Sequence, residues 1–245
     1  MTINEPNQQL SPAIGEKLEQ YFIDITAGCP YGLPEKAVYH QALFGSLDAS
    51  TMGVFLANGY RRNGNCMYSM RCPGCRECVP IRLNPKAFTP NRNQKRVWKK
   101  NRDVTVGVAP LTMSDENIAL LDRFLRIRFP AGKSTAESYY TGFFITSITR
   151  CFEIRYRVND KLLGVAVVDG SDQWLNAVYF YFDPDECRRS PGTLNILHLV
   201  NFCRSHRIKQ LYLGYRIESI QAMRYKSAFT PHEILVDDCW RQMDS

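Results

Sequence analysis

The sequence has no long hydrophobic run: none of its 245 residues lies in an apolar stretch of 18 or more. A transmembrane helix needs about 20 such residues, so we expect neither a membrane span nor a membrane partner. Residues 1–20 are polar and partly acidic, where a secretory signal peptide would have a basic start and an apolar centre. These absences predict a globular, cytoplasmic protein with a polar N-terminal tail at 1–20.

Acidic residues are scarce in one part of the chain. Between Arg61 and Arg102, twelve lysines and arginines accompany a single acid, Glu77, which gives this segment a charge of +11. The whole chain carries +7, so the remainder sums to −4. Such an imbalance favours a polyanionic partner such as nucleic acid, with a solvated basic face as the alternative.

Histidine is also rare. The four histidines (His40, His198, His206 and His232) have neither metal-ligand nor catalytic-triad spacing. The segment Ala131–Ser134 resembles the end of a nucleotide-binding phosphate loop, but Ile127 occupies the position of its first glycine. The sequence therefore gives no support to a P-loop enzyme.

Cysteine, by contrast, is plentiful, with nine residues. In a reducing compartment, clustered thiols indicate a metal and scattered ones a core. The cluster is Cys72, Cys75 and Cys78, and for the fourth ligand we favour Cys29 over Cys66. Arg82 stands where a ferredoxin pattern would continue with cysteine, so structural zinc is favoured, while an iron–sulfur cluster and unliganded thiols stay open.

A basic helix is predicted directly after the cysteine cluster. Thr89 and Pro90 make a suitable start, as N-cap and first helical residue, for a helix over 91–101. Its cations recur at helical spacing on one face: Arg92, Lys95, Arg96, Lys99 and Lys100. Like charges in this arrangement repel one another, and a bound phosphate backbone would relieve that repulsion.

The second half alternates helical and strand patterns. Helices are expected over Ser114–Phe129, Thr135–Ser147, Leu194–His206 and Ser219–Ala228. Strands are expected over Cys151–Val158, Leu162–Asp169, Trp174–Phe182, Gln210–Tyr215 and Glu233–Val236. We predict an α/β (α+β) protein whose mixed sheet carries flanking helices. A small cysteine-containing domain (21–104, beginning with a strand near Tyr21–Ile25) would precede it, and the order within 105–245 is similar to the GNAT acyltransferase fold.

Two segments place polar groups where ligands tend to bind. Before the predicted helix at Leu194, backbone N–H groups and basic side chains can hold an anion; the residues are Arg188, Arg189, Ser190, Gly192 and Thr193. At the end of the strand Gln210–Tyr215, a second group gathers Tyr215 and Glu218 with Tyr225 and Lys226 of the following helix.

Taken in order, these blocks resemble one family, the bacterial aspartate/glutamate leucyltransferases, relatives of the arginyl-tRNA–protein transferases. The resemblance runs from about Tyr21 to Pro231. It includes Cys29-Pro-Tyr, Gly59-Tyr-Arg-Arg-Asn-Gly, Cys72 to Arg82, Phe88 to Arg96, Arg189-Ser-Pro-Gly-Thr193, and Tyr212-Leu-Gly-Tyr215 to Lys226. Departures occur at Pro191, Arg216 and Phe129–Thr135.

The resemblance implies an aminoacyl-tRNA donor and a protein acceptor beginning with Asp or Glu, which is thereby marked for degradation. On this basis Arg92, Lys95, Arg96 and Lys99 would hold the tRNA, and the loop Arg188–Thr193 its 3′ end. Tyr215, Tyr225 and Lys226 would line the reaction centre, Asp183 or Glu218 would take the proton, and Arg62, Arg82 or Arg216 would bind the acceptor's carboxylate. No cofactor is expected for the chemistry.

Three alternatives stay open at this stage. Arginine as the donated residue would need an acidic pocket instead of an apolar one. A metal-stabilised RNA-binding protein without catalysis would bind RNA and transfer nothing. A coenzyme A acyltransferase would be protected from unfolding by acetyl-CoA instead of RNA. The oligomeric state does not follow from the sequence.

Overall fold

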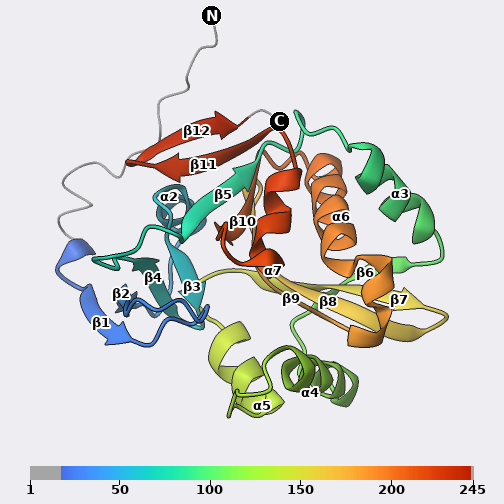
Figure 1. Ribbon diagram of the computed structural model, residues 1–245, viewed down its shortest axis with the longest axis horizontal. Coiled ribbons are helices and arrows are strands. Elements are labelled where there is room, and N and C mark those ends of the chain that lie inside the picture. Colours follow the sequence, from blue (N-terminus) through green and yellow to red (C-terminus); the bar gives the residue numbers. More distant parts are fainter. Residues whose placement is uncertain (1–17, 244–245) are drawn as a thin grey trace, which may run out of the picture.

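The computed structural model describes residues 18–243, so most of the predicted tail at 1–20 lies outside the described residues (Figure 1). Two sheets organise the chain, one of four strands and one of eight. Within residues 18–243, no helix is long and apolar enough to cross a membrane.

The eight-stranded sheet has the order β12-β11-β5-β10-β9-β8-β7-β6. Its strands are β5 (Val79–Leu83), β6 (Thr105–Pro110), β7 (Cys151–Val158), β8 (Lys161–Gly170), β9 (Trp174–Phe182), β10 (Gln210–Arg216), β11 (His232–Val236) and β12 (Cys239–Met243). Pairing is antiparallel except between β9 and β10, which run parallel. The mixed sheet with flanking helices predicted from the sequence is confirmed.

The first half of the chain contributes a strand to this sheet. Strand β5 pairs antiparallel with both β10 and β11. It follows the predicted cysteine cluster, whereas its two neighbours lie far beyond residue 104. The division of the chain near residue 104 stays a prediction, and the main sheet draws strands from both sides of it.

The small sheet has the order β1-β2-β4-β3, with β1 (Ile23–Ala27), β2 (Ala37–Leu43), β3 (Arg61–Asn63) and β4 (Cys66–Met70). Helix α2 (Ala49–Ala57) lies against it and buries Met52, Phe55 and Leu56 together with Met67 of β4. The Asp48 side chain begins this helix by accepting a hydrogen bond from the Thr51 N–H.

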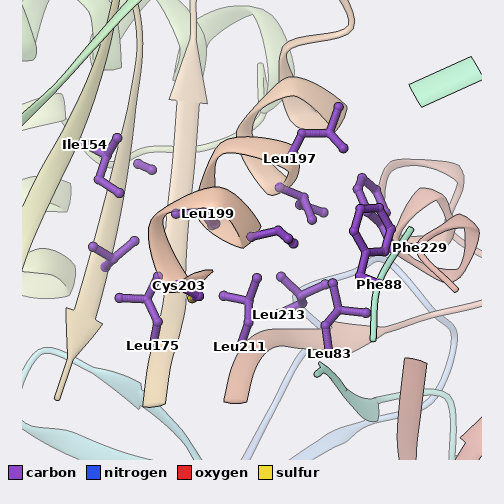
Figure 2. Packing of buried hydrophobic residues seen from close by; sticks show 14 of the residues in the cluster. Leu83, Phe88, Ile154, Leu175, Leu197, Leu199, Cys203, Leu211, Leu213 and Phe229 are labelled. Atoms are coloured by element: carbon purple, nitrogen blue, oxygen red, sulfur yellow. The ribbon is translucent and has the colours of Figure 1, made fainter. Parts of the chain in front are cut away.

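The core of the large sheet is divided by strand β8, which is buried on both faces. Leu163, Ala166 and Val168 join a cluster that includes helix α6 (Pro191–Ser205). Val165 and Val167 point to the other face, into a cluster with helix α4 (Asp115–Arg128). Figure 1 shows α6 on one side of the sheet and α4 on the other, and Figure 2 shows the α6 cluster.

Helix α3 (Arg92–Lys100) packs beside α6. Its N-cap is Asn91 instead of the predicted Thr89, because Asn91 and Gln94 form a reciprocal capping box. Helix α6 begins at Pro191, earlier than the predicted Leu194, so that Gly192 and Thr193 belong to its first turn.

Two predicted helices are shorter or less regular than expected. The segment Thr135–Ser147 holds a short helix α5 (Ala136–Tyr139) that continues as a π-helix only to Phe144. The segment Ser219–Ala228 holds one short helix α7 (Gln221–Arg224) and a 3₁₀ turn to Ala228. In the first segment Tyr139, Phe143 and Phe144 pack on Tyr179 of β9, and this packing outweighs the local preference for a regular helix.

Candidate active site

The parallel strands β9 and β10 separate part-way along their length. They pair only from Trp174 to Asn176 and from Gln210 to Tyr212. Beyond this point β10 has an irregular register against β5, and Gly214 has a φ of +84°, a conformation that favours glycine. We call the place where the two strands diverge the fork; it begins at Ala177 on β9.

Arg61 enters the fork from the small sheet. Its guanidinium donates a 3.0 Å hydrogen bond from Nη2 to the Ala177 carbonyl, and a side chain at Gly214 would lie only 3.0 Å from the same nitrogen. The residue is 8% exposed, and no described carboxylate forms an ion pair with it. Burial lowers the pKa of Arg61, and a cation held this way is costly without an anionic partner.

Lys226 lies at the β10 side of the fork, whereas Arg61 bonds to β9. Its Nζ donates a 2.8 Å hydrogen bond to the carbonyl of Tyr215 on β10. Burial, and then the charge of Arg61, lower the pKa of Lys226 to about 7. At neutral pH a large share of this amine is therefore uncharged and able to accept a proton.

Tyr225 connects this pair with the start of helix α6. A side chain at Gly192 would lie 3.3 Å from the Tyr225 ring, so the two residues are close neighbours. The Ser190 side chain does not cap α6, which leaves the first-turn N–H groups of Gly192 and Thr193 without a side-chain partner among the described residues. Ser190 itself is left-handed, at a φ of +56°. Free N–H groups and the helix dipole suit an anion here.

The predicted basic stripe also comes together in the structure. An open hollow of about 480 Å³ is lined by Pro90, Asn91, Arg92, Lys95, Arg96 and Lys99. The C-terminal end of α3 is joined to the loop before α6, since Lys100 donates to the Arg188 carbonyl at 2.6 Å and Asn101 to the Arg189 carbonyl at 3.0 Å. These bonds hold the basic helix α3 beside the exposed Arg188 and the segment that precedes α6.

Other predicted cations are already paired inside the protein. Arg62 is fully buried and holds Asp169, itself fully buried, at 2.7 to 3.0 Å, while also donating to the carbonyls of Phe143 and Phe144. Arg189 is paired with Asp103 and Glu186. We therefore do not carry the predicted acceptor role of Arg62 into the proposal below.

Arg82 and Arg216 are similarly engaged. Arg82 forms a two-pronged pair with Glu233 and lies over the Trp240 ring at 4.1 Å. Arg216 holds Glu218, two residues further along the chain.

The two predicted proton acceptors are also held by cations. Glu218 pairs with Arg216. Asp183 pairs with Arg123 and Lys161. Burial alone would raise the pKa of Asp183, but hydrogen bonds from Lys161 and from the Asp185 N–H outweigh burial and lower it. A carboxylate of this kind is a weak base, and Lys226 is better suited to take a proton.

The four predicted metal ligands lie near one another. The pKa of Cys78 is raised to about 12 by burial and then by the neighbouring Cys72, Cys29 and Cys75. Cys72 also accepts from the Val38 N–H at 3.5 Å. As they stand, however, no three histidine, cysteine or acidic side chains among residues 18–243 are arranged to hold a metal ion. A structural metal here stays a prediction, and no step below passes through one.

The sequence did not single out Arg61 as a candidate site residue. Arg61 and Arg62 are consecutive on strand β3, and neighbouring residues of a strand point to opposite faces. The sequence therefore allowed the inference that one of the two arginines forms an internal ion pair and the other does not. It did not indicate which of the two is paired.

Comparison with known proteins places the chain in a family. Residues 27–96 match the arginine-tRNA-protein transferase N terminus, and residues 116–236 match its C terminus. An aspartate/glutamate leucyltransferase from Thiobacillus denitrificans is 32% identical over 92% of this chain and 95% of its own length. The aspartate/glutamate leucyltransferase from Shewanella putrefaciens is 38% identical over 80% of this chain and 83% of its own length.

A solved structure, L-PGS from Bacillus licheniformis, is 11% identical with a TM-score of 0.48, and the match covers 83% of this chain and 66% of that chain. A likeness this weak supports no statement about function. The matched families and relatives are those of a transferase. The chain belongs to the aminoacyl-tRNA–protein transferase family, in which its relatives are named aspartate/glutamate leucyltransferases.

Proposed function

We propose that this chain transfers leucine from leucyl-tRNA to the N-terminal Asp or Glu of acceptor proteins and thereby marks them for degradation. The observation that carries the proposal is the fork, where an unpaired buried cation, Arg61, lies beside an amine of lowered pKa, Lys226. Relatives that bear the name of this activity support it.

The acceptor would bind through both of its N-terminal groups. Its side-chain carboxylate would pair with Arg61, which forms no ion pair within residues 18–243; the nearby Asp169 is held by Arg62. Its α-ammonium would then lie near Lys226 and give up a proton to the neutral amine. An acceptor with an uncharged first side chain would leave Arg61 unpaired, so this arrangement would favour Asp and Glu.

The transfer then needs little beyond positioning. The freed acceptor amine attacks the ester carbonyl of the aminoacyl-tRNA, and a bond forms between that nitrogen and that carbon. The carbon–oxygen bond to the terminal ribose breaks, and the second proton of the attacking nitrogen passes to the ribose oxygen. The free N–H groups of Gly192 and Thr193 would hold the negatively charged end of the tRNA or the developing oxyanion.

The choice of leucine follows from the state of the carboxylates. A donated arginine would need an unpaired acid beside its guanidinium. The buried acids among the described residues are Glu153, Asp169 and Asp183, and each is already paired. Tyr139 packs with Phe143, Phe144 and Tyr179 of strand β9, the strand that forms one side of the fork. We propose that this aromatic cluster receives the apolar side chain of the donated leucine.

The test is transfer of radiolabelled leucine and arginine, each supplied as charged tRNA, to peptides beginning with Asp or Lys. Leucine incorporation confined to the Asp peptide is the expected result. Arginine incorporation would contradict the donor assignment and keep the reaction class. RNA binding without transfer of either amino acid would contradict catalysis.

A further inference from the structure

A second hollow lies beside the basic one, between helices α3 and α6. It measures about 280 Å³ and is lined by Phe88, Pro90, Lys95, Trp98, Leu197, Asn201 and Arg204. Pockets for small ligands begin at roughly 300 Å³, so this hollow suits one flat group. It shares Pro90 and Lys95 with the basic hollow, so the two form one continuous surface.

Trp98 makes this hollow unusual. Its side chain is 39% exposed, although large aromatic residues normally bury their rings. It lies on the ring of His198 with centroids 4.5 Å apart, which fixes the indole in place. Burial lowers the pKa of His198 to about 4, so the residue beneath Trp98 is neutral. A fixed, exposed aromatic ring among cations is what single-stranded nucleic acid stacks upon.

We propose that this hollow binds one unpaired nucleobase of the tRNA, whose backbone follows the cations of the neighbouring basic hollow. The base would stack on Trp98 between Phe88 and Leu197, and the exposed amide of Asn201 could bond its edge. The phosphates on either side would contact Lys95 and Lys99. The inference rests on the proposed function, which supplies the RNA.

The position of the hollow assigns the base to a nucleotide near the reacting end, but not to the last one. Thr193 lies in the first turn of α6, and Leu197 and Asn201 follow it by four and eight residues along the same helix. At 1.5 Å per residue they lie roughly 6 and 12 Å from Thr193 along the helix axis. The terminal ribose must reach the fork, so the base on Trp98 belongs to a preceding unpaired nucleotide.

The experiment measures binding of the intact protein to uncharged RNA, which separates it from catalysis. The probes are an RNA hairpin with a single-stranded 3′ extension, the same hairpin with a blunt end, and a series with one abasic nucleotide moved along the extension. Trp98→Ala should weaken binding of the extended hairpin about tenfold and leave the blunt hairpin unchanged. Removing the base at one position of the extension should weaken binding to the wild-type protein by the same factor. Trp98→Ala should bind this abasic RNA no more weakly than it binds the intact extended hairpin.

Lys99→Ala is the matched control on the same helix. It should weaken both hairpins and reduce the salt dependence of binding by about one phosphate contact, whereas Trp98→Ala should leave that dependence unchanged. Trp98→Phe retains a stacking ring and should restore most of the affinity, which excludes misfolding as the cause.

Equal weakening of blunt and extended hairpins by Trp98→Ala would overturn the base site, as would the absence of any effect. In both cases RNA binding itself would still stand, and so would the proposed function. If wild-type protein binds neither hairpin, the proposed function fails and this inference fails with it.

Discussion

The neighbouring arginines of strand β3 offer a matched pair of substitutions with opposite expected effects. Arg62→Ala leaves Asp169 buried, with the Asn176 amide as a remaining partner at 3.0 Å. Breaking a buried pair from one side costs about 3–5 kcal/mol of unfolding free energy. For a chain of this length, 1 kcal/mol shifts the melting temperature by about 2–4 °C, so we expect a drop of roughly 10 °C.

Arg61→Ala removes a buried cation that forms no ion pair with any carboxylate among residues 18–243, so the unfolding free energy should change by about 1 kcal/mol at most. The variant should instead bind the acceptor peptide more weakly. A hydrogen bond between charged groups contributes about 1.5–3 kcal/mol, which corresponds to a loss of roughly 10- to 150-fold in kcat/KM for an Asp peptide.

The assay compares transfer to peptides beginning with Asp and with Asn, together with thermal unfolding of both variants. Arg61→Ala should abolish most of the preference for Asp over Asn while its melting temperature stays near that of the wild type. If Arg61→Ala melts as early as Arg62→Ala, the arginine is a structural anchor. If it slows transfer to both peptides equally, the carboxylate assignment is refuted.

Three further predictions follow from the same site. Lys226 has a pKa of about 7 and accepts a proton only when neutral, so kcat/KM should rise tenfold per pH unit below about pH 7 and level off above it. Arg61→Ala removes a like charge and should therefore move this rising limb of the pH profile to higher pH. A limb that stays in place would contradict the assignment. Gly214→Ala should reduce the selectivity for Asp, because Gly214 has a φ of +84° and an added Cβ would lie 3.0 Å from Nη2 of Arg61. Gly107→Ala on edge strand β6, where an added Cβ meets open space, should leave the selectivity unchanged. Equal losses in the two variants would refute the steric argument. Metal analysis of the purified protein should find about one structural site per chain that is lost in Cys75→Ser, and a metal-free, fully folded protein would contradict it.

Local pattern was sufficient for much of the second half. The hairpin around Asn159 and Asp160 was predicted because both residues tolerate the left-handed backbone they adopt, at φ values of +46° and +65°. Strand Trp174–Phe182 and the Ser114 cap of helix α4 were predicted from alternation and from capping preference.

What the sequence could not supply is long-range pairing. Strand β5 lies between β10 and β11, more than 100 residues away along the chain, and nothing in its five residues specifies those partners. The same limit concealed the site. Arg61 comes near Lys226 only because strand β3 of the small sheet places the Arg61 side chain at Ala177 of β9. The roles of the site residues stay predictions, and the structure changes which of them we favour.

The most direct test of the central claim is the single-turnover rate of leucine transfer, at saturating leucyl-tRNA and Asp peptide, for wild type and Lys226→Met. Saturation removes binding from the comparison, and methionine retains much of the lysine's length without its amine. We predict a rate at least about a hundredfold lower, with the pH limb near 7 abolished. An unchanged rate and an unchanged limb would show that the proton is taken elsewhere and that the fork is not the reaction centre.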